Sequence, residues 1–594
     1  MAAKTNCMNK LSLILVAVFV TLTAYTQNVA YKLEMPEPQK HYFYVTMNVD
    51  GWKKNTLEVK MPVWAPGSYL VREFAKGVDY VKATSGGSTL SVTKIDKSTW
   101  QIKTDGKSKI EIKYNVYAYE TSVRTSFLDA SHGFVSGTSV FMYIPELKQT
   151  PGTLEIVPGD FKKISTALKS NSATNFSYTN IDEFYDSPIE IGNHTEFEFM
   201  AAGCKHRVAM YGEGNYETEK LKTDMGRIVE EETKVWGENP NKEYLFIIHN
   251  LTVGSGGLEH ANSTTLDVSR TTYSAGGYYG FLSIVAHEYF HLWNVKRMRP
   301  AGLWPYDYDK ENYTDLLWIS EGFTSYYDEL ILRRCGFYDD ANYIRTLNSN
   351  LANVENTPGS RVQSAAESSY DAWIKGYRPN ENSNNRCISY YPKGSMIGAM
   401  LDIEIIAATK GKMKLDDLMK KIYNEFYKTK KSGFSFNDFK TATEAICGKK
   451  MDDFFNKLVF TAGEIDYNEY LNKVGYSWIA NPKGNEAWLG ANTKDQGGKC
   501  VVTSVVDGSC AQQFGINVND EILALNGARV DNSNFLRAIS TYQVGQVVNI
   551  LISRDNLIQT IKVTLDKSYL KDYLIAPENG LSEEKKALKK KWLN

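Results

Sequence analysis

The chain has 594 residues, of which 42% are hydrophobic and 23% charged, and its formal net charge is −1. That length allows about three or four domains, and the composition is normal for a water-soluble globular protein. Because no basic block precedes the C-terminal tail, the charge pattern argues against binding to nucleic acid.

Residues 1–27 are typical of an export signal peptide. Lys4 and Lys10 supply the positive region, residues 11–23 are apolar, and small residues follow directly. The apolar run is short for a membrane span. We therefore expect an exported protein, periplasmic or secreted, with no membrane contact after the signal is cleaved; retention of the signal as an anchor is the alternative.

The cysteines that follow residue 27 leave two possibilities open. An even number in an exported protein permits disulfides, but buried free thiols fit the same pattern, and no C-x-x-C metal motif is present. The sequence does not decide between these possibilities. The residues concerned are Cys204, Cys335, Cys387, Cys447, Cys500 and Cys510.

Residues 28–203 are predicted to form an N-terminal β domain, either a twisted sheet or a sandwich. Strand-like segments occur at residues 42–49, 56–61 and 109–118. Turn signals such as Pro66-Gly67 and Pro158-Gly159 separate segments of this kind. No cluster of titratable residues stands out in this part of the chain.

Residues 204–477 are predicted to form a catalytic domain. A helix is expected at 218–236 and a buried strand at 244–249, before Gly256, Gly257 and Glu259. Glycines let the backbone approach a ligand closely, and a carboxylate just after them can reach it. An exposed glutamate on an edge strand is the alternative reading. We expect residues 264–270 to form the edge at which a peptide adds as one more strand.

His287, Glu288 and His291 form an H-E-x-x-H motif, although the chain has only 8 histidines. Residues four apart share one face of a helix, so both imidazoles can point at one ion. Zinc suits two imidazoles and a carboxylate with water in the fourth position, and Glu288 lies where a general base would reach that water. The alternative is a pair of core histidines bonded to backbone carbonyls.

Two downstream carboxylates are candidates for the same site. Glu321 opens a helix-like segment at 321–332, where an acidic residue also simply complements the helix dipole. Asp328 lies two turns further along the same face. It could bond the second ring nitrogen of a zinc histidine, or it could be an exposed helix acid. Further helices are expected at 395–408, 415–427, 436–447 and 451–461.

Residues 478–570 change character and resemble a PDZ domain. Strands are expected at 500–506, 547–553 and 559–565, and Trp488-Leu489-Gly490-Ala491 matches the loop that binds a chain terminus. The groove either binds a peptide C-terminus or only packs on the catalytic domain. Residues 571–594 are a charged, Lys-rich tail that we expect to form a short helix.

Several motifs together resemble the glycyl aminopeptidase branch of the gluzincin zinc metallopeptidases. The H-E-x-x-H motif is followed, after 29 intervening residues, by the glutamate of Trp318-Ile319-Ser320-Glu321-Gly322-Phe323. The run HEYFHLWNVKRMRP from His287 to Pro300, the GGLEH form at 256–260, and segments at 64–74 and 185–188 fit the same branch. Tyr391-Pro392-Lys393-Gly394 is similar to its Y-x-K-G element, which selects Tyr391 over Tyr390.

The resemblance implies a multidomain α+β protein: an N-terminal β domain, a thermolysin-like catalytic domain and a C-terminal PDZ domain. It implies one zinc ion per chain, held by His287, His291 and Glu321. It also implies that Glu259 binds the free α-amine of a peptide substrate and that Tyr391 donates to the oxyanion. The family prefers small N-terminal residues such as Gly or Ala.

The predicted function is therefore hydrolysis of N-terminal residues from peptides, with Glu288 as general base. A PDZ-guided zinc endopeptidase and a catalytically inactive peptide-binding protein are the alternatives. The sequence does not predict the oligomeric state.

Overall fold

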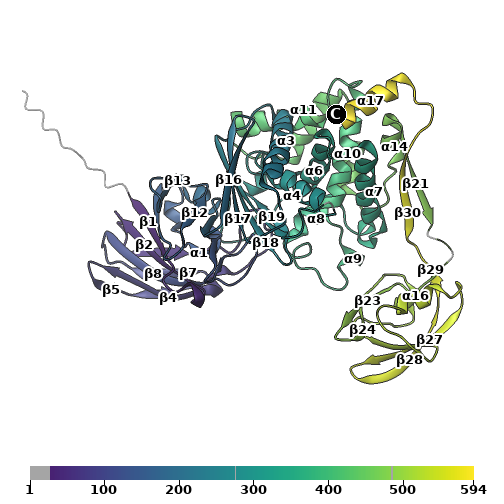
Figure 1. Cartoon of the computed structure of the whole chain (residues 1–594), viewed down its shortest axis with the longest axis horizontal. Helices are drawn as coiled ribbons and strands as arrows, with labels where there is room; N and C mark the ends of the chain where they lie inside the picture. Colours follow the sequence, from purple (N-terminus) through teal and green to yellow (C-terminus); the bar gives the residue numbers. More distant parts are fainter. Residues whose placement is uncertain (1–26, 275, 483, 485) are drawn as a thin grey trace, which may run out of the picture.

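The computed structural model describes residues 27–594 apart from 275, 483 and 485 (Figure 1). The predicted signal peptide lies outside the described residues except for its last position. Among the described residues, no helix combines the length and apolar character needed to cross a membrane. The chain has the expected multidomain α+β architecture: N-terminal sheets, a helical region packed on a further sheet, and a separate C-terminal β unit (Figure 1).

Three sheets form the N-terminal region, and their strands follow the alternation of apolar and polar residues. In β2, every second side chain from Phe43 to Val49 is buried, which places these residues in the core. The eight-stranded sheet has the order β13 (Lys169–Ser170), β14 (Asn175–Tyr178), β11 (Gly152–Val157), β1 (Asn28–Glu34), β2 (Tyr42–Asp50), β8 (Lys109–Tyr117), β4 (Val78–Ser85), β5 (Ser88–Leu90). The smaller sheets are β3 (Thr56–Lys60), β7 (Thr99–Lys103), β6 (Val92–Lys94), and β12 (Lys163–Thr166), β15 (Ile189–Gly192), β10 (His132–Val135), β9 (Phe127–Leu128).

A five-stranded sheet carries one wall of the catalytic region. Its order is β16 (Thr195–Ala201), β17 (Cys204–Tyr211), β18 (Glu243–Leu251), β20 (Ser263–Ser269), β19 (Ser255–Glu259). Strand β16 lies in the range assigned from sequence to the N-terminal domain, but it pairs with β17. The prediction that residues 264–270 form the open edge is wrong. Strand β20 pairs with β18 on one side and β19 on the other, so β19 is the edge.

Helices cover this sheet, and α4 (Tyr278–Phe290) contacts α3, α6, β19 and β20. Local signals set several boundaries. Ser435 caps the first turn of α12 through the backbone N–H of Asp438, and Gly448 ends the helix in the left-handed region. The other helices are α3 (Thr218–Trp236), α5 (Leu317–Ser320), α6 (Gly322–Arg334), α7 (Asp340–Asn356), α8 (Ala365–Tyr370), α9 (Ser383–Arg386), α10 (Tyr390–Ala408), α11 (Leu415–Ile422), α12 (Phe436–Cys447), α13 (Asp452–Phe455) and α14 (Asn468–Leu471).

Three predicted helices differ from the observed ones. Helix α10 begins five residues before the predicted start at 395, because Ser389 caps it and a proline is tolerated in the first turn. The segments predicted as helices at 415–427 and 451–461 continue beyond α11 and α13 as π-helical turns at Tyr423–Lys430 and Asn456–Phe460. Hydrophobic spacing predicts a helix without specifying its hydrogen-bond register.

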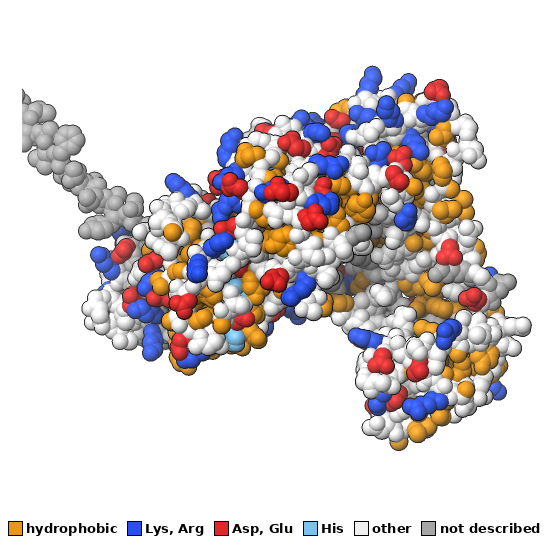
Figure 2. Space-filling view, in the orientation of Figure 1, with side chains coloured by type: hydrophobic (Ala, Val, Ile, Leu, Met, Phe, Trp, Pro, Cys, Tyr) orange, Lys and Arg blue, Asp and Glu red, His pale blue; other side chains and the backbone are white. Residues whose placement is uncertain are grey.

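The C-terminal β unit has its own apolar core, which includes Val502, Ile522, Ile550 and Val563. It contacts the catalytic region through Asn385, which bonds Val505 and Asp507, and a hollow opens beside this junction in the view of Figure 2. Its main strands are β22 (Ala487–Trp488), β23 (Ala491–Gln496), β24 (Lys499–Val505), β25 (Glu521–Leu525), β27 (Val547–Arg554), β28 (Leu557–Thr564) and β29 (Asp566–Lys567), with α15 (Cys510–Gln513) and α16 (Phe535–Ser540).

The tail returns to the catalytic region. Strand β30 (Lys571–Pro577) pairs with β21 (Tyr476–Pro482), so the chain enters and leaves the C-terminal unit through one two-stranded ribbon. Helix α17 (Glu583–Leu593) then buries Trp592 completely, and the indole Nε1 donates to Tyr326 Oη at 3.0 Å. The predicted terminal helix is present, and its apolar face packs into the main core.

Candidate active site

Helix α4 brings the two motif histidines together. His287 lies in its last turn, and His291 follows the helix end with backbone angles that are still helical. The two imidazole ring centroids are 4.7 Å apart. The helix is buried almost all round, as its apolar sequence predicts, so both histidines need polar partners.

Glu321 supplies a carboxylate to the same point. It stands between α5 and α6 as the N-terminal cap residue of α6, rather than inside the helix. Glu321 Oε2 lies 3.3 Å from His291 Nε2 and 3.6 Å from His287 Nε2. Burial raises the pKa of Glu321, but the neighbouring imidazoles outweigh this effect and lower the pKa to about 2. The carboxylate is therefore ionised.

Other groups fix the orientation of both imidazoles. His287 Nδ1 lies 3.0 Å from Asp328 Oδ2, and His291 Nδ1 lies 2.6 Å from the carbonyl oxygen of Asn294. Each Nδ1 atom donates to an oxygen in this arrangement, so Nε2 is the ring nitrogen that each histidine turns toward Glu321. Asp328, which sequence left as either an exposed acid or a histidine partner, is 7% exposed and makes this contact.

Glu288 lies against strand β19. Its side chain packs against Gly257, where an added Cβ atom would lie 2.1 Å from Glu288 Oε1. Only glycine fits at that position. Glu288 Oε2 is buried and has no hydrogen-bond partner among the described residues. Burial raises the pKa of Glu288 to about 7, which is suitable for a group that accepts and returns a proton near neutral pH.

Glu259 ends the edge strand β19 and is only 4% exposed, so it is not the exposed edge glutamate that sequence left open. Its carboxylate faces Gly67 of the N-terminal region, where an added Cβ would lie 2.4 Å from Glu259 Oε1. That oxygen has no hydrogen-bond partner in the part of the chain that the structure describes. Ligand atoms of Glu259, Glu288 and His291 all lie within 4.8 Å of one another, so Glu259 belongs to the same cluster of side chains.

Tyr391 reaches the site through a close crossing of two helices. A Cβ atom added to Gly322 would lie 2.4 Å from Gly394 Cα, so the glycines after Glu321 and Lys393 let α6 and α10 approach each other. This crossing places the Tyr391 ring 6.2 Å from the His287 ring. Burial raises the pKa of Tyr391 well above its ordinary value, so the phenol remains a donor. Tyr390 stacks on Tyr391 and is 3% exposed.

Comparisons with known proteins identify the family to which these domains belong. Residues 30–193 match the family model of the Peptidase M61 N-terminal domain, residues 280–397 that of M61 glycyl aminopeptidase, and residues 487–565 that of the PDZ domain. An aminopeptidase N family protein from Idiomarina loihiensis is 30% identical, with a TM-score of 0.89 over 95% of this chain and 100% of that one. The chain belongs to the M61 glycyl aminopeptidase family.

Two further structures are more distant. The M1 zinc metallopeptidase from Deinococcus radiodurans is 14% identical, with a TM-score of 0.48 over 73% of this chain and 93% of that one. Legionella pneumophila aminopeptidase A, solved in complex with aspartic acid, is 11% identical, with a TM-score of 0.46 over 94% of this chain and 57% of that one. No curated protein sequence matches the chain.

Membership of the M61 family makes the chain a metallo-aminopeptidase, and the residues present fit a metal. Two Nε2 atoms and one carboxylate converge, and the Nδ1 atom of each imidazole already has a partner, which is a donor set suited to a divalent transition metal. Three buried side chains with carboxyl groups, Glu259, Glu288 and Glu321, lie at this site. The resulting negative charge favours a cation and an ammonium group.

Sequence reasoning missed the contribution of the N-terminal region to this M61 site. Arg124 reaches across and donates from Nη2 to the carbonyl oxygen of Gly257 at 3.2 Å. Asp186, in one of the segments noted only for its resemblance, bonds His260 Nδ1 at 3.0 Å and Lys296 Nζ at 2.7 Å. These contacts hold β19 at its middle residue and just beyond its C-terminal end, but no motif in the sequence links residues so far apart.

The described cysteines do not form disulfides. Cys204, Cys335, Cys387, Cys447, Cys500 and Cys510 are all free in the structure. Four of the six are buried, which fits the free-thiol alternative.

Proposed function

We propose that this M61 protein is a zinc aminopeptidase that removes small N-terminal residues, Gly or Ala, from peptides. The observation that carries the proposal is the buried carboxylate of Glu259, which ends the edge strand beside the metal-binding residues and keeps one oxygen unpaired. A free α-ammonium group would complete that oxygen's hydrogen bonding and balance its charge. An N-blocked peptide would leave it unpaired, at a cost in affinity.

His287, His291 and Glu321 would hold one zinc ion. When bound, zinc acts as a Lewis acid that polarises the scissile carbonyl and lowers the pKa of water. The protein's part is to hold the three ligands in place through Asp328 and the Asn294 carbonyl.

Glu288 moves the proton in the proposed reaction. Its free oxygen, Oε2, accepts a proton from the attacking water, and the same carboxyl group then donates that proton to the leaving amine. The raised pKa of about 7 matches both halves of this task. The backbone of Gly257 packs closely against this carboxylate.

Tyr391 donates to the oxyanion as the tetrahedral centre forms. The peptide backbone would pair with β19, since that strand has one unpaired edge and ends at Glu259. The strand therefore orients the substrate, and Glu259 sets how far it enters. The small-residue preference is proposed from family membership.

The C-terminal unit has the features of a peptide-binding PDZ groove. Strand β23 is at the edge of its sheet, and Gly490 in the preceding loop has a φ of +78°. We propose that this groove takes a peptide C-terminus. The unit also contacts the catalytic region, where Asn385 donates to the carbonyl oxygen of Val505 at 2.8 Å, so packing on the peptidase is the other role to test. Isothermal titration with peptides that have a free or an amidated C-terminus separates the two roles.

The test of the main proposal uses residues 28–594 and one Ala-first peptide, prepared free and N-acetylated, with products followed by mass spectrometry. Loss of single N-terminal residues from the free form alone supports the aminopeptidase. Internal cleavage of both forms would favour the endopeptidase alternative. A pure protein that binds no zinc and cleaves neither form would favour the binding-protein alternative.

We also propose that the protein is exported to the periplasm or beyond the cell, on the basis of residues 1–27. Cell fractionation followed by N-terminal sequencing of the mature protein tests this. A start close to residue 28 supports cleavage, and recovery of an intact N-terminus in the membrane fraction supports the anchor.

A further inference from the structure

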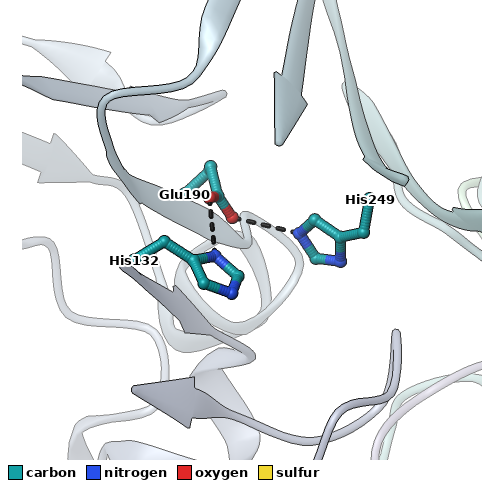
Figure 3. A group of neighbouring side chains, drawn as sticks. All are labelled: His132, Glu190 and His249. Carbon is teal, nitrogen blue, oxygen red and sulfur yellow. Dashed lines mark hydrogen bonds and ion pairs between the residues drawn. The ribbon is translucent and has the colours of Figure 1, made fainter. Parts of the chain in front are cut away.

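A second group of histidine and carboxylate side chains lies far along the chain from the active-site motif (Figure 3). His132 begins β10, Glu190 lies on β15, and His249 lies on β18. One ligand atom from each lies within 4.8 Å of the others. The exposed fractions are 4% for His132, 0% for Glu190 and 3% for His249.

The backbone places these side chains between two sheets. In the register of β10 and β15, His132 pairs with Gly192 and Phe134 with Glu190, so His132 and Glu190 are diagonal neighbours on one face. His249 comes from the five-stranded sheet. Phe134, Ala209, Leu245 and Ile247 form a small apolar cluster between the same two sheets. The group therefore joins the N-terminal region to the catalytic sheet.

Glu190 is the centre of the group. Its Oε1 lies 2.9 Å from His132 Nδ1, and its Oε2 lies 3.0 Å from His249 Nε2 (Figure 3). The other nitrogen of His249, Nδ1, lies 2.9 Å from Asp267 Oδ1 on the adjacent strand β20. The ring of Tyr211 stacks on His132 at a centroid distance of 3.4 Å and holds it in place.

The charges of the group are balanced well by a divalent cation. Two carboxylates are removed from water, and each needs a positive partner. With protons alone, His249 must donate from both ring nitrogens, and one imidazolium ion offsets only one of the two carboxylates. One divalent ion with two neutral imidazoles offsets both.

The arrangement repeats that of the active site. There, Asp328 bonds Nδ1 of His287 and leaves Nε2 to face a carboxylate; here, Asp267 bonds Nδ1 of His249 in the same way. The two histidine ring centroids are 5.7 Å apart, compared with 4.7 Å in the active site. A tetrahedral ion holds its ligand atoms about 3.3 Å apart. One ligand atom from each of the three residues lies within 4.8 Å of the others, so the side chains would close on the ion when it binds.

We propose that His132, Glu190 and His249 form a second metal site for zinc or a similar divalent transition metal, with Asp267 orienting His249. Its ligands come from both sheets, so the bound ion would fasten the N-terminal region to the sheet that carries β19. The role is structural, because His132, Glu190 and His249 are not among the side chains that converge with Glu259 and Glu288. It goes beyond the proposed aminopeptidase function, which requires only one ion.

Metal content tests this site directly. Protein dialysed against zinc and then against metal-free buffer should hold two zinc ions per chain, and Glu190→Gln should hold one. Glu196→Gln is the matched control. Glu196 also pairs with a buried histidine, His194, at 3.7 Å, but among the described residues it is in no cluster that could hold a metal ion. This control should retain two ions. Equal zinc content in wild type and Glu190→Gln would overturn the proposal.

Diffraction from wild-type crystals keeps the test decisive if Glu190→Gln does not fold. Anomalous maps at the zinc absorption edge should show one peak at His287, His291 and Glu321 and another at His132, Glu190 and His249. A peak at the first place alone, in crystals grown with zinc, would overturn the second site and leave the proposed aminopeptidase intact. A peak at His132, Glu190 and His249 alone would support the second site and contradict the proposed zinc site of the aminopeptidase.

Discussion

Glu259→Gln tests the feature that distinguishes an aminopeptidase from an endopeptidase. The substitution keeps the shape of the side chain and removes its charge. Glu259 is 4% exposed and one of its oxygens is unpaired, so its interaction with a substrate ammonium takes place largely out of water. Removing one partner of a buried ion pair costs about 3–5 kcal/mol. At about 1.36 kcal/mol per tenfold, kcat/KM for a free-amine peptide should fall between about 100-fold and about 5,000-fold.

The assay measures kcat/KM for the Ala-first peptide together with zinc content and circular dichroism. Glu243→Gln is the matched control, because it removes the same charge from the exposed first residue of β18 in the same sheet. That control should keep wild-type kinetics. If Glu259→Gln turned over free-amine peptides within about threefold of wild type, with zinc retained, the carboxylate would not anchor the α-amine.

Three other substitutions test separate parts of the structure. Glu288→Gln should retain zinc but lose at least about 100-fold in kcat, and near-normal turnover would rule out its role as general base. Gly257→Ala should lose about 100-fold in kcat with zinc retained, because the new Cβ would lie 2.1 Å from Glu288 Oε1. Its control is Gly280→Ala, since a Cβ added at that position of α4 meets open space. Equal kinetics for the two variants would refute the packing argument. Trp592→Ala should cost about 3–5 kcal/mol of stability and lower the calorimetric Tm. Substitution of the exposed Lys590 by Ala should leave the Tm unchanged. An unchanged Tm in Trp592→Ala would mean that α17 does not support the core.

Local patterns made the centre of the site predictable. Two histidines four residues apart on an apolar helix specify one face and one spacing, so His287 and His291 could be placed without any knowledge of the fold. The same holds for α3 and α12, whose predicted and observed bounds agree because caps and periodicity lie within the segment. Glu321 and Tyr391 depended instead on the family resemblance, because their approach is set by the crossing of α6 and α10 at Gly322 and Gly394.

The edge of the five-stranded sheet shows why other parts of the site could not be predicted from the sequence. Strand β19 contains most of the Gly-Gly-Leu-Glu-His segment, and β20 follows it closely. The choice of edge depends on which of the two strands pairs with β18, a contact that neither segment encodes locally.

The N-terminal region completes the site in the same non-local way. Gly67 with its φ of +87° faces Glu259, and Arg124 bonds the carbonyl oxygen of Gly257, yet each is more than a hundred residues away from its partner. A glycine in a turn and an arginine in a polar loop have ordinary local explanations, so sequence alone gives them no role. Their function follows from the docking of two sheets, and His132, Glu190 and His249 lie between those sheets. A metal ion bound there would therefore influence the position of β19 without touching the substrate.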